Sequence, residues 1–330
     1  MTDVARRAGV SRATASYVLN RTPGARIPEQ TRARVLEAAE QLRYVPHVSA
    51  RSLRRGRSDL VVGHVDGPSS VMRQGLSFVA LVQAARDVRG AGYTFLFHGD
   101  PTVTGVAAAR AWLALRPAAV LAAVDRYTEE SVALLTEAGT VPIALSHTPS
   151  DLVATIVLDD GGLGRAAAEH LLARGCRRIV ALGGCPGTAD QHMLGHRMAE
   201  AVAAAREGGA EARRMPFPPN RESAATLVGG WLAEGTLPDG VVGATTTHAA
   251  HVLTALVDAG VRVPEQVAVL AADDEPLAEL VRPRLTTVSA DLTVGEARMA
   301  DAVLAAVEGR WDPEKAVRRY PATVVPRETA

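Results

Sequence analysis

Apolar residues recur at helical spacing in the first 20 residues and predict two short helices. The positions expected to be buried are Val4, Ala5, Ala8, Ala15, Val18 and Leu19. Gly9 separates the two segments, and it permits the left-handed backbone with which a chain leaves a helix sharply. Ser11 is a favoured N-cap residue for the second segment. The pattern predicts a helix, a tight turn and a second helix within residues 2–20.

The second predicted helix has polar and small side chains opposite its apolar face. Those expected to point outward are Arg12, Ala13, Ser16 and Tyr17. In helix-turn-helix proteins, the early residues of the second helix contact base edges in the major groove. We therefore predict that these four residues, together with Ser11 and Asn20, contact DNA. An ordinary helical hairpin is the alternative interpretation of this segment alone.

Residues 28–43 predict a third amphipathic helix, which favours the DNA-binding interpretation. Its expected apolar face consists of Val35, Leu36, Ala39 and Leu42, and Pro28 suits the first turn of a helix. Residues 44–58 form an Arg-rich segment with one leucine, Leu53. A helix over residues 47–55 would be too short to persist alone in water.

The remainder of the chain alternates apolar runs with helical stretches. The expected strands cover residues 60–65, 93–97, 119–124, 141–145, 178–183, 240–244 and 266–272. The expected helices include residues 74–90, 127–138, 162–174, 190–206, 247–259 and 292–308. Continuous apolar strands separated by helices are typical of parallel sheets covered on both faces. Because these units are too many for one small sheet, we expect two lobes with a break near Leu158–Asp159.

Taken together, the motifs resemble the lactose-repressor/galactose-repressor (LacI/GalR) family of bacterial transcription regulators. In the first 58 residues the matching stretches are DVA..AGVS.AT.S.VLN (3–20), TR.RVLEAAEQL.Y.P (31–46) and ARSLR.GRS (50–58). Later matches include RGCRRI (174–179), the aspartate pair at 273–274 and P.LTTV (283–288). The resemblance follows essentially the whole chain in order, so it is far more specific than any single motif.

The resemblance implies a fold and a domain organisation. An all-α helix-turn-helix domain would occupy residues 1–45, a hinge helix and linker residues 46–58, and a ligand-binding and dimerisation core residues 59–330. The core would be α/β, with two Rossmann-like lobes similar to periplasmic sugar-binding proteins and a ligand cleft between them. Since the family's chain crosses between lobes three times, the N-lobe is expected at about 59–158 and 288–316, and the C-lobe at about 159–287 and 317–330.

The resemblance also assigns a role to the Arg-rich segment. In the family, the hinge folds when two copies pair in the minor groove, and Leu53 matches the leucine that wedges between the central base pairs. The DNA contacts expected here are Ala50, Arg51, Leu53 and Arg54. A simple apolar linker residue is the alternative for Leu53. Tyr17 replaces an arginine common in the family's recognition helix, so an atypical operator sequence is expected.

The expected effector site departs most from the family pattern. The residues that match the family's cleft positions are Ser70, Val71, His147, His192, Thr246 and Asp273. Among them only the aspartate keeps the family's residue type, whereas His192 replaces an arginine and Thr246 an asparagine. Losing these groups, with the cleft aromatics, removes much of what clamps a sugar. Three interpretations stay open: a different small molecule, an ordinary sugar held by other contacts, or no effector response.

Charge is distributed unevenly although the chain has a formal net charge of zero. Residues 1–58 contain 12 arginines and four acidic residues, a net charge of +8, so the remainder carries −8. A basic head on an acidic body is the electrostatic footprint of DNA binding. DNA affinity should therefore fall steeply with salt through counterion release.

Other function classes lack their signatures. No run of 18 apolar residues and no signal-peptide pattern occurs, so no membrane segment and a cytoplasmic location are expected. The two cysteines, Cys176 and Cys185, do not form a disulfide framework. The GGCPG turn at 183–187 has neither a GxGxxG pattern nor a P-loop lysine, and no metal-ligand or catalytic motif is present. We expect no enzyme activity, cofactor or metal; a stand-alone solute-binding protein would need a secretion signal and no basic head.

The hypothesis from sequence is a homodimeric transcriptional repressor that binds a pseudo-palindromic operator. A small-molecule effector in the core would order or melt the hinge and so change DNA affinity. The sequence leaves open whether the effector releases DNA or promotes its binding.

Overall fold

A computed structural model describes residues 1–19, 27–44, 58–64, 76–100, 102–186, 191–290, 299–319 and 321–330. The chain separates into two compact units, Met1–Asp59 and Leu60–Ala330, and each is described by itself. Among the described residues, no helix has the length and apolar character needed to cross a membrane.

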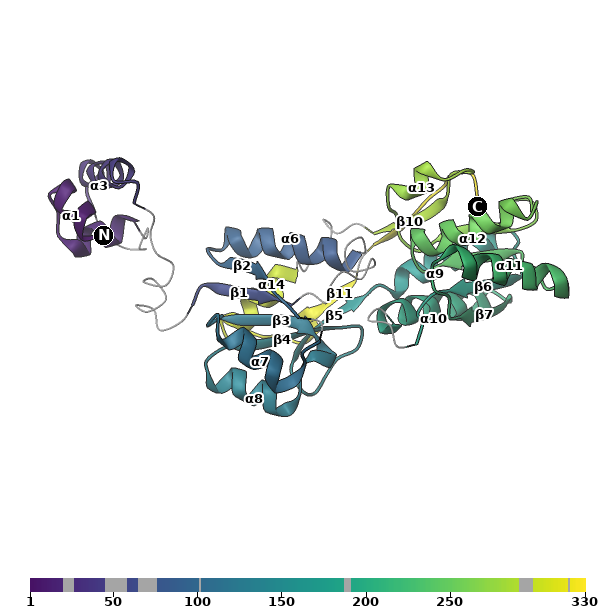
Figure 1. Ribbon diagram of the computed structural model, residues 1–330, viewed down its shortest axis with the longest axis horizontal. Coiled ribbons are helices and arrows are strands. Elements are labelled where there is room, and N and C mark those ends of the chain that lie inside the picture. Colours follow the sequence, from purple (N-terminus) through teal and green to yellow (C-terminus); the bar gives the residue numbers. More distant parts are fainter. Residues whose placement is uncertain are drawn as a thin grey trace. The chain divides into compact units, whose positions relative to one another are not determined.

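The described residues of the first unit form helices α1 (Thr2–Ala8), α2 (Arg12–Leu19) and α3 (Glu29–Gln41) (Figure 1). Gly9 ends α1 with a left-handed backbone, φ 63°, which confirms the predicted turn. Ser11 Oγ accepts the backbone N–H of Thr14 at 3.0 Å and so caps α2. A core of valine and alanine side chains joins the three helices: Val4, Ala5, Ala8, Ala15, Val18, Val35, Ala38 and Ala39.

The buried stripe of α3 differs from the prediction. Val35, Ala38 and Ala39 are buried, whereas Leu36 and Leu42 are 50% and 42% exposed. The predicted placement of both leucines was therefore wrong. The physical reason is that α3 packs against two short helices through small side chains, which leaves a narrow contact that Leu36, one residue further around the helix, does not reach.

The second unit contains two six-stranded sheets. The first has the order β11-β5-β4-β3-β1-β2, and all of its strand pairs are parallel. Its strands are β1 (Leu60–Gly63), β2 (Thr94–Phe97), β3 (Ala119–Ala123), β4 (Val141–Ser146), β5 (Ala154–Asp159) and β11 (Val317–Arg319). Alternate residues of β3 enter opposite clusters, Ala119 and Leu121 on one face and Val120 and Ala122 on the other.

Helices cover both faces of this first sheet (Figure 1). One face packs against α6 (Leu76–Gly90) and α14 (Met299–Val307). The other packs against α7 (Gly105–Leu113) and α8 (Glu129–Glu137). A sheet buried in this way explains why its central strands are continuous apolar runs.

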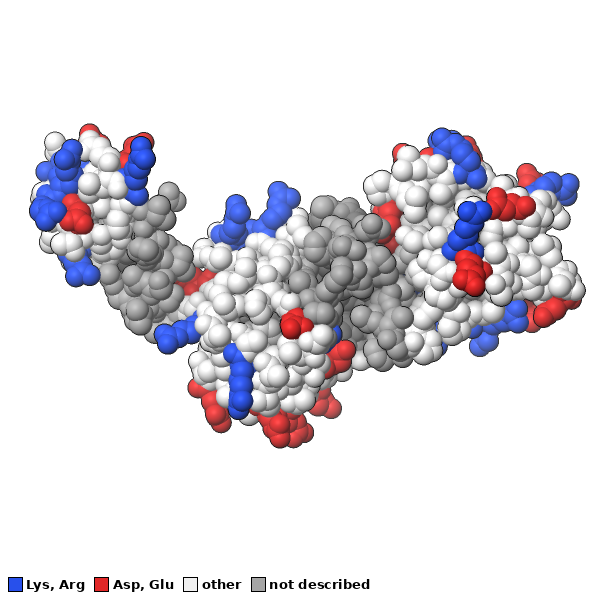
Figure 2. Space-filling model, in the orientation of Figure 1, with Lys and Arg blue, Asp and Glu red and all other residues white. Residues whose placement is uncertain are grey.

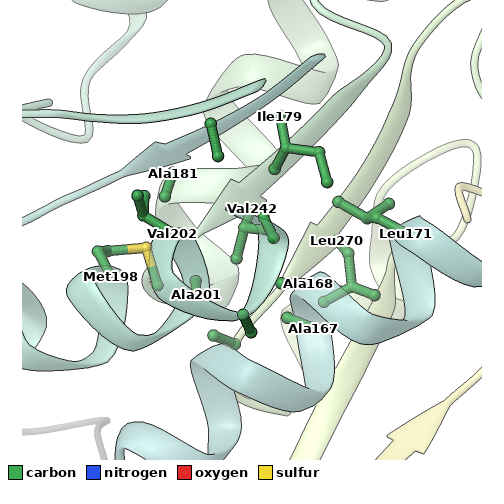
Figure 3. Packing of buried hydrophobic residues seen from close by; sticks show 14 of the residues in the cluster. Ala167, Ala168, Leu171, Ile179, Ala181, Met198, Ala201, Val202, Val242 and Leu270 are labelled. Atoms are coloured by element: carbon green, nitrogen blue, oxygen red, sulfur yellow. The ribbon is translucent and has the colours of Figure 1, made fainter. Parts of the chain in front are cut away.

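The second sheet has the order β12-β10-β9-β8-β6-β7, with only the β10–β12 pair antiparallel. Its strands are β6 (Arg178–Leu182), β7 (Glu211–Met215), β8 (Gly240–Gly243), β9 (Ala268–Ala271), β10 (Thr286–Ala290) and β12 (Ala322–Val325). One face packs against α9 (Gly161–Ala173) and α10 (Gln191–Glu207), where Met198 and Ala201 meet Val242 and Leu270 (Figure 3). The other packs against α11 (Arg221–Glu234), α12 (Thr246–Asp258) and α13 (Leu277–Leu280).

The chain passes between the two sheets three times. It leaves the first sheet after β5, returns to that lobe between β10 and α14, and leaves it again between β11 and β12. Below, the N-lobe is the part built on the first sheet and the C-lobe the part built on the second. This α/β core confirms the predicted fold class.

Candidate functional sites

The exposed side of α2 carries three of the residues predicted to contact DNA. Arg12, Ala13 and Tyr17 are exposed, Tyr17 at 47%, and Ser11 is exposed at the start of the helix. Buried Ala15 and Val18 fix the opposite side of the helix against the rest of the unit. A small helical unit thus presents a guanidinium group and a phenol from the first two turns of one helix.

Ser16 is a correction to the predicted surface. Its exposed fraction is 2%, so its predicted outward orientation was wrong. Because α2 is short and contacts both α1 and α3, its buried side spans positions 15, 16 and 18, and a small hydroxyl side chain fits in that contact. In this structure Ser16 is therefore not available to a base edge.

Basic side chains are frequent on the visible face of the first unit (Figure 2). Exposed ones in the first unit are Arg6, Arg7, Arg12, Arg34 and Arg43. Arg6 pairs with Asp3 at 2.6 Å, and Arg7 donates to Gln41 Oε1 at 2.8 Å, so these two are held against their own unit. Arg12 makes no ion pair with the described residues. Guanidinium groups suit phosphate and guanine recognition because they donate two parallel hydrogen bonds.

Several residues predicted to contact DNA or effector lie outside the described residues. For DNA these are Asn20, Ala50, Arg51, Leu53 and Arg54, and for the effector Ser70 and Val71. His192 lies in α10, but its side chain is not among those described.

In the C-lobe, two predicted effector residues are in direct contact at the carboxyl ends of neighbouring parallel strands. Thr246 begins α12 after β8, and Asp273 follows β9. Asp273 Oδ1 accepts hydrogen bonds from the Thr246 backbone N–H and, at 2.7 Å, from its hydroxyl. Burial raises the pKa of Asp273, against the opposing effects of Arg197 and Thr246. Ligands of open α/β sheets bind at this edge.

Arg197 is a buried charge that was not among the predicted site residues. Only 1% of it is exposed, and its Nε and Nη2 donate to Asp160 Oδ2 at 3.1 and 2.7 Å. Its Nη1 donates to the carbonyl of Ala244 at 2.7 Å, two residues before Thr246. The available signal was its position in α10, where an arginine interrupts the apolar stripe of Leu194, Met198 and Ala201.

His147 approaches the same ion pair from the N-lobe. It follows β4, and its Nδ1 lies 2.8 Å from the Leu158 carbonyl oxygen and 3.5 Å from Asp160 Oδ1. Burial alone would raise the pKa of Asp160, but the charge of Arg197 and the contact with His147 outweigh it and hold the pKa at about 2. The His147 ring also lies 6.0 Å from that of His196 on α10. Arg197 thus contacts Asp160, beside His147, and the Ala244 carbonyl, two residues before Thr246.

Glu275 is a second unusual carboxyl group near Asp273. Its side chain is half-buried, and burial together with the Asp273 charge raises its pKa to about 7, against the opposing charge of Arg197. Asp274, between the two, differs because it pairs with Arg327 at 3.0 Å and accepts from the Thr287 hydroxyl at 2.8 Å. The aspartate pair at 273–274 stands out in the sequence, whereas Glu275 belongs to no motif.

These features define a class of protein, in which a small helix-turn-helix unit is joined to a two-lobed periplasmic-binding-protein-like core. Comparison with known proteins agrees: residues 1–47 match the family described as bacterial regulatory proteins, lacI family, and residues 168–330 match the periplasmic binding protein-like domain. The chain belongs to the lacI family of DNA-binding transcription regulators.

Relatives along the full length carry regulator names. The chain is 30% identical to the HTH-type transcriptional regulator GntR of Pseudomonas aeruginosa, covering 94% of this chain and 90% of that protein. It is 29% identical, with the same coverage, to the HTH-type transcriptional regulator GalR of Escherichia coli. The HTH-type transcriptional repressor PurR of Pectobacterium carotovorum is 28% identical, covering 87% of this chain and 84% of that protein.

Solved structures agree on the fold. The lac repressor dimer bound to operator and the anti-inducer ONPF has a TM-score of 0.74 at 23% identity, covering 99% of this chain and 97% of that one. The transcriptional regulator CelR in complex with cellobiose has a TM-score of 0.66 at 22% identity, covering 99% and 98%.

Proposed function

We propose that this protein is a homodimeric transcriptional repressor that binds a pseudo-palindromic operator and responds to a small molecule bound in its core. The observation that carries the proposal is the exposed face of α2, where Arg12 and Tyr17 project from a unit rich in arginine. Support comes from the structural neighbours, one of which is a dimer on operator DNA with an anti-inducer. The proposal includes no enzymatic activity. The protein would act in the cytoplasm.

Residues are assigned to two kinds of DNA contact. Ser11, Arg12, Ala13 and Tyr17, with Asn20 just beyond α2, would contact the major groove. Ala50, Arg51, Leu53 and Arg54 would contact the minor groove as a paired hinge, on the strength of the family resemblance. Tyr17 offers one hydroxyl and a ring in place of an arginine fork, so it would read a different base pattern.

The effector would bind at the carboxyl edge of the sheets. Thr246 and Asp273 supply the C-lobe side, and His147 approaches from the N-lobe through Asp160 and Arg197. His192, Ser70 and Val71 complete the proposed set. A ligand that contacts both lobes would favour one lobe arrangement and thereby change the spacing of the two heads in the dimer.

The test is selection of bound sequences from a pool of random DNA duplexes, using the full-length chain. We expect a two-fold symmetric consensus for the wild type, a changed or lost base preference for Arg12→Ala, and an unchanged one for Arg110→Ala, an exposed arginine of the core. Two results would contradict the assignment of base contacts to α2. One is binding of DNA without any preferred sequence, and the other is an Arg12→Ala consensus identical to that of the wild type.

A further inference from the structure

A buried carboxylate oxygen in the C-lobe, Asp273 Oδ2, has no hydrogen-bond partner among the described residues. Asp273 is 7% exposed, and its Oδ1 accepts two hydrogen bonds from Thr246. Its Oδ2 is buried and makes no hydrogen bond to any described residue. Burying a carboxylate oxygen without a hydrogen-bond donor costs free energy. Such oxygens are therefore rare in folded proteins, and they recur at binding sites. Capping of α12 accounts for one oxygen of this side chain and not for the other.

The charge around Asp273 is negative and poorly compensated. Glu275, two residues further on, makes no ion pair among the described residues, and burial together with the Asp273 charge disfavours its ionisation, so its pKa is raised. The cation that acts on both is Arg197, which already donates to Asp160 and to the Ala244 carbonyl. Asp274 is neutralised separately by Arg327. Within the part of the chain that the structure describes, Asp273 and Glu275 therefore have no positive partner of their own.

The missing partner is better supplied by an amine than by a metal ion. Within the described part of the chain, no three His, Cys, Asp or Glu side chains converge in a way that would hold a metal. An ammonium group needs only two or three acceptors; Asp273 Oδ2 lacks a donor among the described residues, and Glu275 follows two residues later. Phosphorylated or carboxylate effectors would face these same charges and be repelled.

We propose that the effector of this regulator is a cationic, amine-bearing small molecule whose ammonium group pairs with Asp273 and Glu275. The inference rests on the proposed effector response and specifies its chemical class. It predicts that neutral sugars bind weakly and that sugar phosphates do not bind.

The first experiment compares probes of matched size by thermal unfolding of the full-length protein. One series is putrescine, 1,4-butanediol and succinate; the other is glucosamine, glucose and glucose 6-phosphate. We expect the amine of at least one series, at millimolar concentration, to raise Tm above the shift of its neutral and anionic counterparts. This gain should be lost in both Asp273→Asn and Glu275→Gln.

Three results would overturn the inference. They are stabilisation by succinate or glucose 6-phosphate, an equal shift with magnesium chloride alone, and no response to either amine in a protein that still selects an operator. The last result leaves the DNA-binding function intact, whereas loss of operator selection would contradict the proposed function itself.

A second experiment needs no ligand. In the unliganded protein, Asp273→Asn and Glu275→Gln should each raise Tm by a few degrees, because each removes an uncompensated charge. Asp160→Asn is the matched control and should lower Tm, because its carboxylate is paired with Arg197. If Asp273→Asn and Glu275→Gln lower Tm as much as Asp160→Asn, both carboxylates are satisfied in place and the inference is wrong.

Discussion

At the scale of single residues, the most consequential feature is an ion pair with almost no access to water. Arg197 and Asp160 have side chains that are 2% and 4% exposed. A pair of this kind contributes less to net stability than its geometry suggests, since both ions lose their hydration. Removing one partner is nevertheless strongly destabilising, because the other is left buried and uncompensated.

Arg197→Met should therefore lower the free energy of unfolding by about 3–5 kcal/mol, as measured by urea denaturation. Arg165→Met is the matched control: this arginine pairs with Glu207 at 2.7 Å on the exposed side of the same helix pair, and we expect little change. Similar losses in the two variants would contradict the assigned difference. Asp160→Asn combined with Arg197→Met should recover part of the loss.

Glu275 gives a pH dependence whose sign follows from its raised pKa. Burial and, after it, the Asp273 charge raise its pKa in the folded protein from an ordinary 4.5 to about 7, against the opposing charge of Arg197. The folded state therefore binds this proton more tightly, and the stability it contributes is lost as the pH rises from about 4.5 to about 7. We expect Tm of the wild type to fall relative to Glu275→Gln across this window. Parallel pH profiles would show that the carboxyl group titrates normally.

At the scale of elements, the apolar pattern of the sequence predicts several central strands and misses others. Central strands such as β3 and β8 are continuous apolar runs and were expected. Edge strand β7, Glu-Ala-Arg-Arg-Met, was missed because only one of its residues is buried, and the short edge strands β11 and β12 were missed as well. Strands β5 and β10 were also missed, although they are central and largely buried. Edge strands expose one side to water and so lose the apolar signal.

The candidate site shows the same limit. Thr246 and Asp273 could be proposed because they follow predicted strands, where parallel sheets bring side chains together. The Arg197–Asp160 pair could not, because it joins residues 37 positions apart through the packing of α9 against α10. The predicted exposure of Ser16 and the predicted burial of Leu36 were wrong for a related reason. In a small helical unit, the neighbouring helices as well as periodicity decide which residues are buried.

Gly164 tests the close contact of α9 and α10. A Cβ at this position would overlap the Arg197 carbonyl oxygen, whereas one at Gly162 in the same helix would meet nothing within 4 Å. Gly164→Ala should therefore cost about 1–3 kcal/mol through forced separation of the helices. Gly162→Ala should be neutral or slightly stabilising, because alanine favours a helix. Urea denaturation of both variants measures the contrast, and equal stability would contradict the close approach.

At the scale of the whole molecule, charge separates the two units. Arginines dominate the first unit, whereas the remainder of the chain carries a net negative charge. DNA phosphates therefore attract the basic first unit and repel the acidic remainder, which confines DNA to the first unit. This property and the family could be read from the sequence.

Binding to random-sequence DNA should accordingly weaken steeply with salt. Replacing exposed Arg34 and Arg43 by alanine should reduce the slope of log K against log salt by about 1 for each phosphate contact removed. Two core arginines, Arg110 and Arg284, replaced together give a control with the same change in net charge. Fluorescence anisotropy at several salt concentrations measures the slopes; equal slopes for the two double variants would contradict a head-specific contact.

The position of Asp160 restricts how this protein can be re-engineered. It lies where the chain first crosses from one sheet to the other, and it contacts His147 from the N-lobe and Arg197 from the C-lobe. A chimaera that joins one lobe of this chain to the other lobe of a relative would separate these residues. It would leave a buried charge without its partner at the junction of the two lobes. Exchange of effector specificity by recombination should therefore succeed only when the three residues are transplanted as a set.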